Sequence, residues 1–376
     1  MKAVFVTNFC PHYHVKLFEM LATRMDIEFL FTSRGQEWYW DPRHGVRHGA
    51  FQHEYLAGTR AASPAVVTAR LGRRLLASQA EVVFCALVGR LSLLVAYAGA
   101  RAQGIPFVLW TGLWTHPRTM VHRISFPVLR AIYRGSGALV VYGSHVREYL
   151  AGLGIQREKI FVSRHALDNS LYSLPVAPAD LEALRLRYSL GDRRVVLFVG
   201  RLTPIKGIRN LIEATAQIQD LRPVLLLAGD GELAQELATL GQEKGIEARF
   251  VGYVATEELY KFYALADVFA LPSVTVKAGR EAWGLVVNEA MNQGAPVVTS
   301  AAVGAAAGGL VRDGETGLVV PEGNATALGI ALRRLLEDRS YADRLGAQGR
   351  AEIASWNNER MASAFVDAAE YAIKHG

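Results

Sequence analysis

The sequence predicts an α/β protein made of two doubly wound parallel-sheet domains with a cleft between them. First, the chain has 376 residues, whereas single hydrophobic cores stop growing near ~250–300 residues. Second, short β-branched and aromatic runs alternate with helix-length segments, as in parallel βα units. Third, the alternation breaks once, around residues 173–179, where Pro175 and Pro178 disfavour regular structure. We therefore expect one domain over 1–174 and a second over 175–355.

The individual strands follow from the same apolar runs. In the first domain we expect strands at 3–7, 27–32, 82–86, 106–111, 138–142 and 160–163. In the second domain we expect them at 195–199, 224–228, 249–251, 268–271 and 297–300. Each set forms its own sheet, so the chain is expected to carry two sheets with helices between successive strands.

Composition places the chain among globular proteins. Apolar residues make up 51% and charged residues 20% of the chain, which is within the globular range. The most apolar stretch, 91–100, is flanked by Arg90 and Arg101 and is far shorter than the ~20 residues of a spanning helix. Met1 leads directly into a strand pattern without signal-peptide features. These features predict a cytoplasmic protein, with a peripheral position at the inner membrane face left open.

Cysteine content and charge indicate which covalent or metal sites and which binding partners to expect. The two cysteines, Cys10 and Cys85, are too few for a disulfide framework or a metal cluster and are expected to be core thiols. Residues 1–190 carry 22 Lys and Arg against 12 Asp and Glu, whereas residues 191–376 carry 19 against 23. A basic first lobe favours an anionic acceptor or a membrane surface. Basic residues that only increase solubility are the alternative.

Several motifs are missing from the sequence. It contains no G-x-G-x-x-G turn, no G-x-x-x-x-G-K-[ST], no H-E-x-x-H, no C-x-x-C and no D-x-D. A nicotinamide oxidoreductase, a phosphate-loop ATPase, a zinc protease and a D-x-D metal-dependent transferase therefore lose support. We predict no metal site, no cofactor and no nucleic-acid partner.

A basic loop opens the second domain. Gly200 and Arg201 follow the strand at 195–199, so the guanidinium is expected at the carboxyl edge of the sheet, where ligands bind in open α/β folds. Lys206 follows on the loop before a helix expected at 208–218. Two cations can then converge on one anion, and a pyrophosphate suits them. Surface solvation of both side chains is the alternative.

Two glutamates eight residues apart form the second candidate element. At ~100° per residue, the side chains of Glu281 and Glu289 point in different directions, so their roles are expected to differ. A helix that begins near Gly284 can hold an anion at its first amides. A buried carboxylate can accept both hydroxyls of a ribose, at ~1.5–3 kcal/mol for each bond to a charged group. A solvated helix glutamate is the alternative.

Five motifs follow one another in the second domain: the run 199–213, Ala228-Gly229-Asp230-Gly231, Leu271-Pro272-Ser273 leading to Glu281 and Glu289, Gly294-Ala295-Pro296-Val297-Val298, and Gly314-Glu315-Thr316-Gly317-Leu318. In this order they resemble the carboxyl-terminal domain of family-four retaining glycosyltransferases. The order is far more specific than any single motif. The resemblance implies the GT-B fold, which consists of two Rossmann-like domains with the donor bound mainly on the second. It also implies that a terminal helix, 356–376, crosses back to the first domain.

The resemblance assigns roles to the donor-site residues. Arg201 and Lys206 would bind the donor pyrophosphate, beside Gly200, and Glu289 would bind the ribose. Glu281, together with the amides near Gly284 and Leu285, would hold the transferred sugar. Backbone atoms around Val254 would contact the base, with UDP or GDP as the expected carrier.

Catalysis and acceptor binding are assigned to fewer residues. The catalytic candidates are Glu281, Lys206, Arg201 and His116. His116 is included because members of the family often carry a histidine in the cleft, after a strand of the first domain. Trp38, Trp114 and His116 are the acceptor-binding candidates, because aromatic rings with polar edges suit sugar faces. The segment Asn8–His14 departs from the glycine-rich loop that many members carry, so glycan, lipid-linked and small-molecule acceptors all stay open.

The expected function is transfer of a hexose from a nucleotide-diphosphate sugar to a hydroxyl, with retention of configuration and without metal. In the family the leaving phosphate takes the acceptor proton. A sugar-nucleotide epimerase and a non-catalytic sugar-nucleotide-binding protein are the alternatives. Residues 118–134 form a basic amphipathic pattern that suits contact with anionic lipid. Packing of its apolar residues into the core is the favoured interpretation.

Overall fold

The computed structural model describes residues 1–35, 43, 49–56, 64–87 and 89–376. The chain divides into two compact units. The N-terminal unit comprises Met1–Trp114, Met120–Leu167 and Asn357–Gly376. The C-terminal unit comprises Thr115–Thr119 and Asp168–Trp356. The chain thus enters the second unit seven residues before the expected boundary after residue 174, and its last helix belongs to the N-terminal unit.

The N-terminal unit is built on a parallel sheet of seven strands in the order β3-β2-β1-β4-β5-β6-β7. Its strands are β1 Lys2–Thr7, β2 Asp26–Phe31, β3 His53–Tyr55, β4 Val82–Ala86, β5 Phe107–Thr111, β6 Ala138–Val141 and β7 Ile160–Val162. Its helices are α1 Val15–Arg24, α2 Pro64–Ala77, α3 Arg90–Ala102, α4 Met120–Gly135, α5 Ser144–Gly152 and α15 Asn358–His375. The six expected strands are confirmed to within a residue or two, and the edge strand β3 was not predicted.

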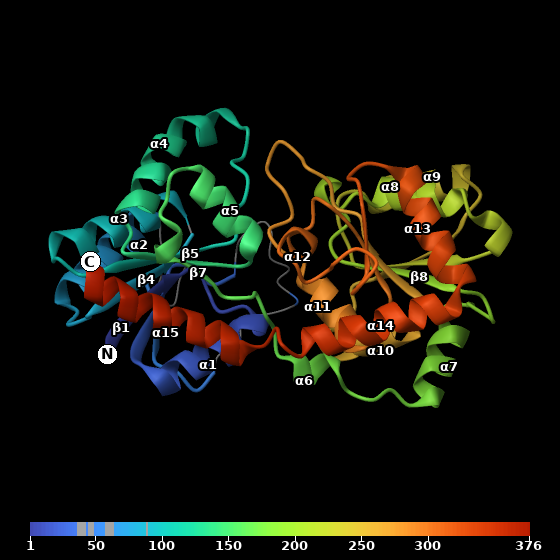
Figure 1. The fold of residues 1–376 in the computed structure, drawn as a ribbon, viewed down its shortest axis with the longest axis horizontal. Helices are drawn as coiled ribbons and strands as arrows, with labels where there is room; N and C mark the ends of the chain where they lie inside the picture. Colours follow the sequence, from blue (N-terminus) through green and yellow to red (C-terminus); the bar gives the residue numbers. More distant parts are fainter. Residues whose placement is uncertain (36–42, 44–48, 57–63, 88) are drawn as a thin grey trace. The chain divides into compact units, whose positions relative to one another are not determined.

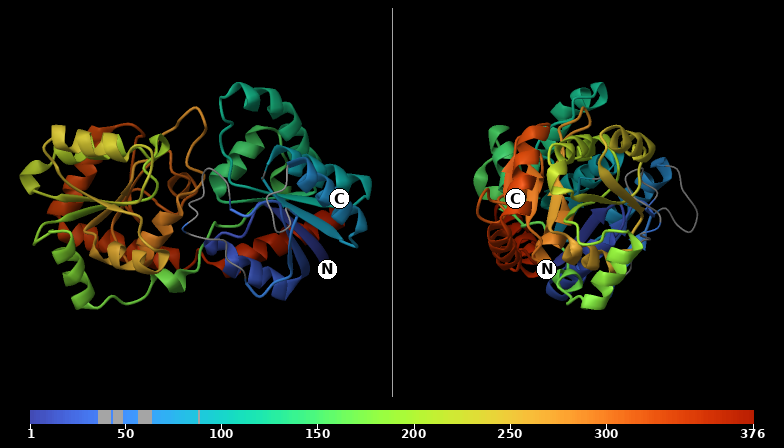
Figure 2. Two further views of the ribbon diagram at one scale, coloured as in Figure 1. Left: turned by 180° about the vertical axis from the view of Figure 1, so that it is seen from behind. Right: turned by 90° about the vertical axis from the view of Figure 1, so that its right-hand side faces the viewer.

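Helices cover both faces of this sheet, as Figures 1 and 2 show. On one face, α2, α3, α4 and α5 bury a core with the strand residues that point their way. On the other face, α1 and α15 pack around Phe5, whose ring lies 5.5 Å from Phe29 and 5.8 Å from Phe365. Because successive strand side chains alternate between faces, every strand of this sheet except the edge strand β3 contributes to both cores. Cys10 and Cys85 are both free and fully buried, as expected of core thiols.

Helix α4 packs on the core through one side only. Of its sixteen residues, Ile132 and Tyr133 are buried, and Leu129 packs against the same core. The favoured expectation that apolar residues of 118–134 enter the core is confirmed for these residues. Met120 and Ile124, on the outer side of the helix, are 68% and 72% exposed.

The C-terminal unit contains a second parallel sheet, in the order β10-β9-β8-β11-β12-β13. Its strands are β8 Val195–Val199, β9 Val224–Ala228, β10 Glu247–Gly252, β11 Val268–Leu271, β12 Val297–Ser300 and β13 Leu318–Val320. Its helices are α6 Asn169–Tyr172, α7 Pro178–Arg187, α8 Ile208–Ala216, α9 Ala234–Glu243, α10 Leu259–Leu265, α11 Leu285–Asn292, α12 Gly304–Ala307, α13 Ala325–Glu337 and α14 Arg339–Ile353. The five expected strands are confirmed, and β13 was not predicted.

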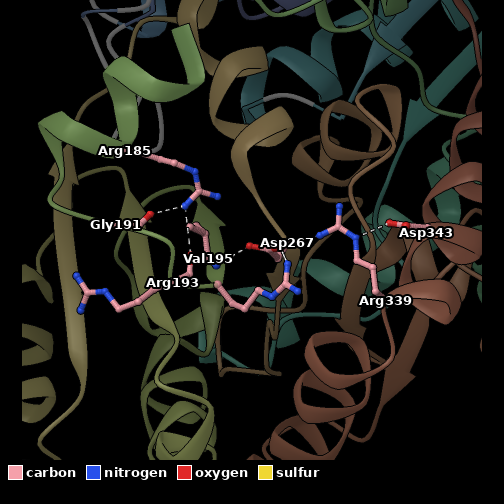
Figure 3. A network of polar contacts seen from close by, with 8 residues as sticks. Arg185, Gly191, Arg193, Val195, Asp267, Arg339 and Asp343 are labelled. Carbon is pink, nitrogen blue, oxygen red and sulfur yellow. Dashed lines mark hydrogen bonds and ion pairs between the residues drawn. The ribbon is translucent and has the colours of Figure 1, made fainter. Parts of the chain in front are cut away.

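Ion pairs hold the amino-terminal edge of this second sheet together (Figure 3). Asp267 accepts hydrogen bonds from the backbone amide of Val195 at 2.8 Å and from the guanidinium groups of Arg194 at 2.9 Å and Arg339 at 3.2 Å. The aspartate side chain is only 11% exposed. These contacts lock the starts of β8 and β11 side by side. The ends of the same two strands are therefore also held next to each other.

No helix among the residues that the structure describes combines the length and the apolar character needed to cross a bilayer.

Candidate functional site

The candidate site lies where the strand order of the C-terminal sheet reverses. From β8 the chain adds β9 and β10 on one side, and then β11, β12 and β13 on the other. In open α/β sheets, ligands bind outside the carboxyl ends of the strands at such a reversal. The loop after β8 runs from Gly200 to Gly207, and the loop after β11 runs from Pro272 to Gly284. Both loops carry the residues that the sequence singled out.

An ion pair joins these two loops. Lys206 donates a hydrogen bond from Nζ to Oε2 of Glu281 at 2.6 Å, and the two side chains are 13% and 16% exposed. The hydroxyl of Ser273 donates to the same carboxylate oxygen at 3.2 Å. Bonds to charged groups are about twice as strong as neutral ones. The carboxylate of Glu281 is therefore fixed in place, and an ammonium group is held at the carboxyl edge of the sheet.

Backbone contact keeps the two loops together. The amide of Val274 donates to the carbonyl of Ile205 at 2.8 Å. Gly207, which ends the short turn Pro204–Lys206, has φ +66°, and a Cβ there would lie 2.0 Å from the carbonyl oxygen of Pro272. Only glycine combines that backbone angle with so close an approach. The position of Lys206 thus depends on the residue that follows it.

Helix α11 supplies a second group that can bind an anion. It begins at Leu285, and its N-cap is Gly284, with φ +90° and no side-chain cap. The first amides of a helix have no partner within the helix and carry the positive end of its dipole. An anion at this end can accept from them. The expectation that the helix begins near Gly284, with Glu281 just before it, is confirmed.

Glu289 has surroundings of its own. It is 7% exposed, and the hydroxyl of Tyr263 donates to its Oε2 at 2.6 Å. Tyr172 also bonds to it. Burial raises the pKa of Glu289 to about 7, and the bonds from the two tyrosines partly offset that rise. The two glutamates therefore occupy different environments, as their spacing predicted.

This buried acid should give stability a measurable pH dependence. A carboxyl whose pKa is about 7 when folded and 4.5 when unfolded binds more protons in the folded state, so stability falls as pH rises from about 4.5 to about 7. Glu289→Gln stays neutral and lacks this loss. The free energy of unfolding of the variant, relative to that of the wild type, should therefore rise by roughly 3 kcal/mol between these two pH values. Urea unfolding at several pH values measures the gain. Glu243→Gln on the surface is the control, and an equal slope in both variants would contradict the assignment.

The remaining donor-site candidates also lie at the carboxyl edge of the C-terminal sheet. Gly200 and Arg201 follow β8 directly, and both are half-buried. Val254 is half-buried on the loop after β10, two strands from β8. Their positions at strand ends are those of ligand-binding residues in this class of sheet. Their roles toward a donor remain predictions.

The structure describes two of the three acceptor candidates, Trp114 and His116, which lie two residues apart in the chain. Trp114, in the N-terminal unit, is half-buried and packs edge-on against His145 at 5.0 Å. His116 is half-buried in the short segment Thr115–Thr119 of the C-terminal unit. Trp38 lies outside the described residues. The role of these three residues toward an acceptor remains a prediction.

The sequence argument missed a buried aromatic cluster in the N-terminal unit. The ring of His14 lies 4.8 Å from that of Trp110 and 5.6 Å from that of His165, which stacks on Tyr142 at 3.8 Å. Burial lowers the pKa of His165 to about 3 and that of His14 well below its usual range. Both rings are therefore neutral at physiological pH. The only signal in the sequence was the run His12-Tyr13-His14 after the first strand.

Residues 185–352, most of the C-terminal unit, match the family model described as "Glycosyl transferases group 1". The C-terminal unit belongs to this glycosyltransferase family. The matched region contains every donor-site candidate named above. The resemblance expected from the five motifs, and with it the fold class, is confirmed.

Curated relatives match part of the chain. A GDP-mannose-dependent alpha-(1-6)-phosphatidylinositol monomannoside mannosyltransferase of Mycobacterium tuberculosis is 36% identical over 197 residues, which are 50% of this chain and 51% of that protein. An alpha-D-kanosaminyltransferase of Streptomyces kanamyceticus is 29% identical over 269 residues, 66% of each chain. The chain spans about half the length of the first of these relatives.

Solved structures show the fold of the whole chain. HepE of Anabaena, crystallised in complex with UDP and glucose, superposes with a TM-score of 0.75 over 98% of both chains at 19% identity. A sucrose-phosphate synthase of Thermosynechococcus elongatus gives 0.77 over 98% of both chains at 23% identity. At these identities the likeness establishes the GT-B architecture.

Proposed function

We propose that this glycosyltransferase moves a hexose from a nucleotide-diphosphate sugar to an acceptor hydroxyl, with retention of anomeric configuration and without metal. The observation that carries the proposal is the ion pair between Lys206 and Glu281 beside the start of α11 at the strand-order reversal. A cation, an uncapped helix end and a fixed carboxylate are the groups that a sugar diphosphate needs. The family match of this domain supports the same conclusion.

Each group has a role in the proposed reaction. Lys206 and Arg201 hold the diphosphate and stabilise the charge that develops on it as the bond to the sugar breaks. Glu281, with the amides of α11, positions the sugar, and Glu289 accepts the ribose hydroxyls. The acceptor oxygen bonds to the anomeric carbon, and its proton passes to the leaving phosphate. In this scheme fixed positive groups stabilise the charge on the leaving diphosphate, which a metal ion does in other transferases.

The donor carries UDP or GDP in this proposal. Relatives are named for GDP-mannose, and a structural neighbour was crystallised with UDP-glucose, so these two sugars head the candidates. A lipid-linked acceptor, and with it a peripheral position at the inner membrane face, is supported by the relative that acts on a phosphatidylinositol monomannoside. Glycans and small hydroxyl compounds are the other acceptor classes.

Donor binding should be visible in thermal unfolding. A donor at ~100 times its dissociation constant stabilises the folded state by about 2.7 kcal/mol. UDP-, GDP- and ADP-sugars are tested one by one beside NAD. We expect one class of sugar nucleotide to raise the Tm of the wild type. Glu289→Ala should lose that shift, whereas Glu243→Ala on the surface of α9 should keep it. A shift with NAD alone would overturn the proposed donor class.

Turnover then separates a transferase from its rivals. With donor alone, a transferase should release nucleoside diphosphate only at the slow rate of hydrolysis, and addition of the right acceptor should accelerate release. Conversion of the donor into another sugar nucleotide without any acceptor would indicate an epimerase. Binding without turnover across a broad acceptor panel would indicate a sensor.

A further inference from the structure

Two tyrosines from different helices meet at the carboxylate of Glu289. Tyr263 on α10 is fully buried, and its hydroxyl donates to Oε2 of Glu289 at 2.6 Å. Tyr172, the last residue of α6, is 2% exposed and bonds to the same carboxyl group. Burial, and after it the negative charge of Glu289, raise the pKa of both tyrosines. Both hydroxyls therefore keep their protons and act as donors throughout the physiological pH range.

The two tyrosines leave the carboxylate able to accept two more hydrogen bonds. An ionised carboxylate only accepts, and its two oxygens offer about four lone-pair positions. The tyrosines occupy two of these positions, and the two neighbouring hydroxyls of a ribose need the other two. A protonated carboxyl group carries a donor in place of one acceptor position, so it cannot accept all four bonds. The arrangement therefore suits a diol only when Glu289 is ionised.

Contacts outside the carboxylate hold both tyrosines in place. Helices α6 and α10 both contact α11, and the three helices lie together in Figure 1. Gln293, just after α11, donates from Nε2 to the carbonyl of Tyr172 and to that of Leu174 at 2.9 Å. The ring of Tyr263 packs edge-on against Phe269 of β11 at 5.6 Å. Backbone bonds and ring packing thus set where the two hydroxyls lie.

The other elements packed against α11 bring little charge to Glu289. Helix α14 also contacts α11, and its Arg350 approaches Gly294, which lies beyond the end of α11. Strands β11 and β12 have the sequences Val-Phe-Ala-Leu and Val-Val-Thr-Ser, without a charged residue. The exposed Glu257 acts on Tyr172. Protonation of Glu289 is therefore governed by its burial and by the two tyrosine hydroxyls.

We propose that Tyr263 and Tyr172 are positioning residues for the donor, which hold the Glu289 carboxylate as an anion oriented toward two ribose hydroxyls. The proposal rests on the proposed role of Glu289 toward the ribose. It has a consequence for binding, because burial disfavours the ionised carboxyl group below about pH 7. Donor binding should release the proton of Glu289 and should weaken as pH falls below that value.

Isothermal titration calorimetry of the full chain with UDP-glucose and with GDP-mannose tests this proposal. Intact sugar nucleotides are suitable because they lack the phosphomonoester that titrates near pH 6. Titrations in buffers with different heats of ionisation count the protons released. The wild type should release about one proton per donor at pH 6 and almost none at pH 8.5, and its affinity should be roughly tenfold weaker at pH 6.

Tyr263→Phe removes one bond to the anion and should move the midpoint of proton release from about pH 7 to about pH 8. Its affinity should be roughly tenfold below that of the wild type at pH 6 and within about twofold at pH 8.5. Tyr172→Phe should behave in the same way. A tyrosine that only supported the fold would lower affinity equally at every pH. Tyr260→Phe on the same helix α10 is the matched control and should follow the wild type.

The outcomes separate this inference from the proposed function. Donor binding without proton release at pH 6 would overturn the inference and leave the proposed function standing, as would an equal loss of affinity at every pH in Tyr263→Phe. Proton release that persists in Glu289→Gln would overturn it too, because another group would then titrate. Failure of both sugar nucleotides to bind the wild type at any pH would overturn the proposed donor class, and the inference with it. The wild-type proton count needs no variant, so the test holds even where a substitution impairs folding.

Discussion

Lys206→Ala is expected to lower kcat by about 10²–10³, because removal of one preorganised charged group that stabilises the developing anion costs that much in other enzymes. The variant loses more than a contact with substrate. The carboxylate of Glu281, 16% exposed, keeps the hydroxyl of Ser273 but loses the ammonium that neutralises it. Steady-state release of nucleoside diphosphate, with the donor found by the thermal panel, measures the effect.

A second lysine of the same unit provides the control. Lys261 on α10 pairs with Glu258 at 2.9 Å and, like Lys206, has a side chain that is mostly covered. Its ion pair lies near the surface, where such pairs contribute little to folding stability, about 0–1 kcal/mol. Lys261→Ala should therefore leave kcat within about twofold of the wild type. If Lys206→Ala retained a comparable kcat, the cation at the carboxyl edge would have no catalytic role.

The Lys206–Glu281 pair can also be resolved by a double-mutant cycle. If Glu281 acts only by holding Lys206, then Glu281→Gln in the Lys206→Ala background should cost nothing more. If Glu281 also positions the sugar, as proposed, the double variant should fall below both single variants. The cycle isolates the coupling, provided that neither single change adds new contacts.

Most strands of both sheets could be predicted because a buried parallel strand is a short apolar run, which is a local pattern in the sequence. All five expected strands of the C-terminal sheet and all six of the N-terminal sheet are present. The two strands that were missed, β3 and β13, have three residues each. Length alone does not explain these misses, because β7 also has three residues and was predicted from its apolar run Ile160–Val162. His53–Tyr55 has no apolar run of its own, and it forms a strand by pairing with β2.

The positions of candidate residues in the fold could be predicted where the signal is local in sequence, and their roles stay predictions. Lys206, Gly284 and the two glutamates were placed by their distance from a strand end or a helix start. Tyr263, by contrast, was not predicted as the partner of Glu289. It lies 26 residues away, on another helix. No local pattern indicates which side chain a folded chain will bring to a carboxylate.

Helix α4 shows a further limit. Its period correctly predicted an amphipathic helix, yet the period alone does not say whether the apolar side meets the core or solvent. That orientation is decided by which residues reach the sheet, and here Ile132 and Tyr133 do so while Ile124 does not. The favoured interpretation, packing on the core, holds for Leu129 and Tyr133, while apolar residues on the outer side of the helix stay exposed.

Gly207→Ala is expected to destabilise the C-terminal unit by more than about 4 kcal/mol, a loss at the extreme of single substitutions. Two penalties add. The backbone angle of +66° costs an L-residue roughly 1–2 kcal/mol. The new Cβ would also lie 2.0 Å from the carbonyl oxygen of Pro272, a backbone atom that cannot move without separating the two loops. Thermal or urea unfolding measures the loss.

Gly245 allows the two penalties to be separated. It has the same φ of +66°, and a Cβ there would meet nothing within 4 Å. Gly245→Ala should therefore cost only the backbone penalty, about 1 kcal/mol, and should leave donor binding intact. Gly207→Ala should be far less stable and, where still folded, should bind donor weakly, because Lys206 can no longer reach Glu281. Equal stability of the two alanine variants would show that the loops after β8 and β11 separate easily. The close backbone approach would then not be what holds Lys206 in position at the site.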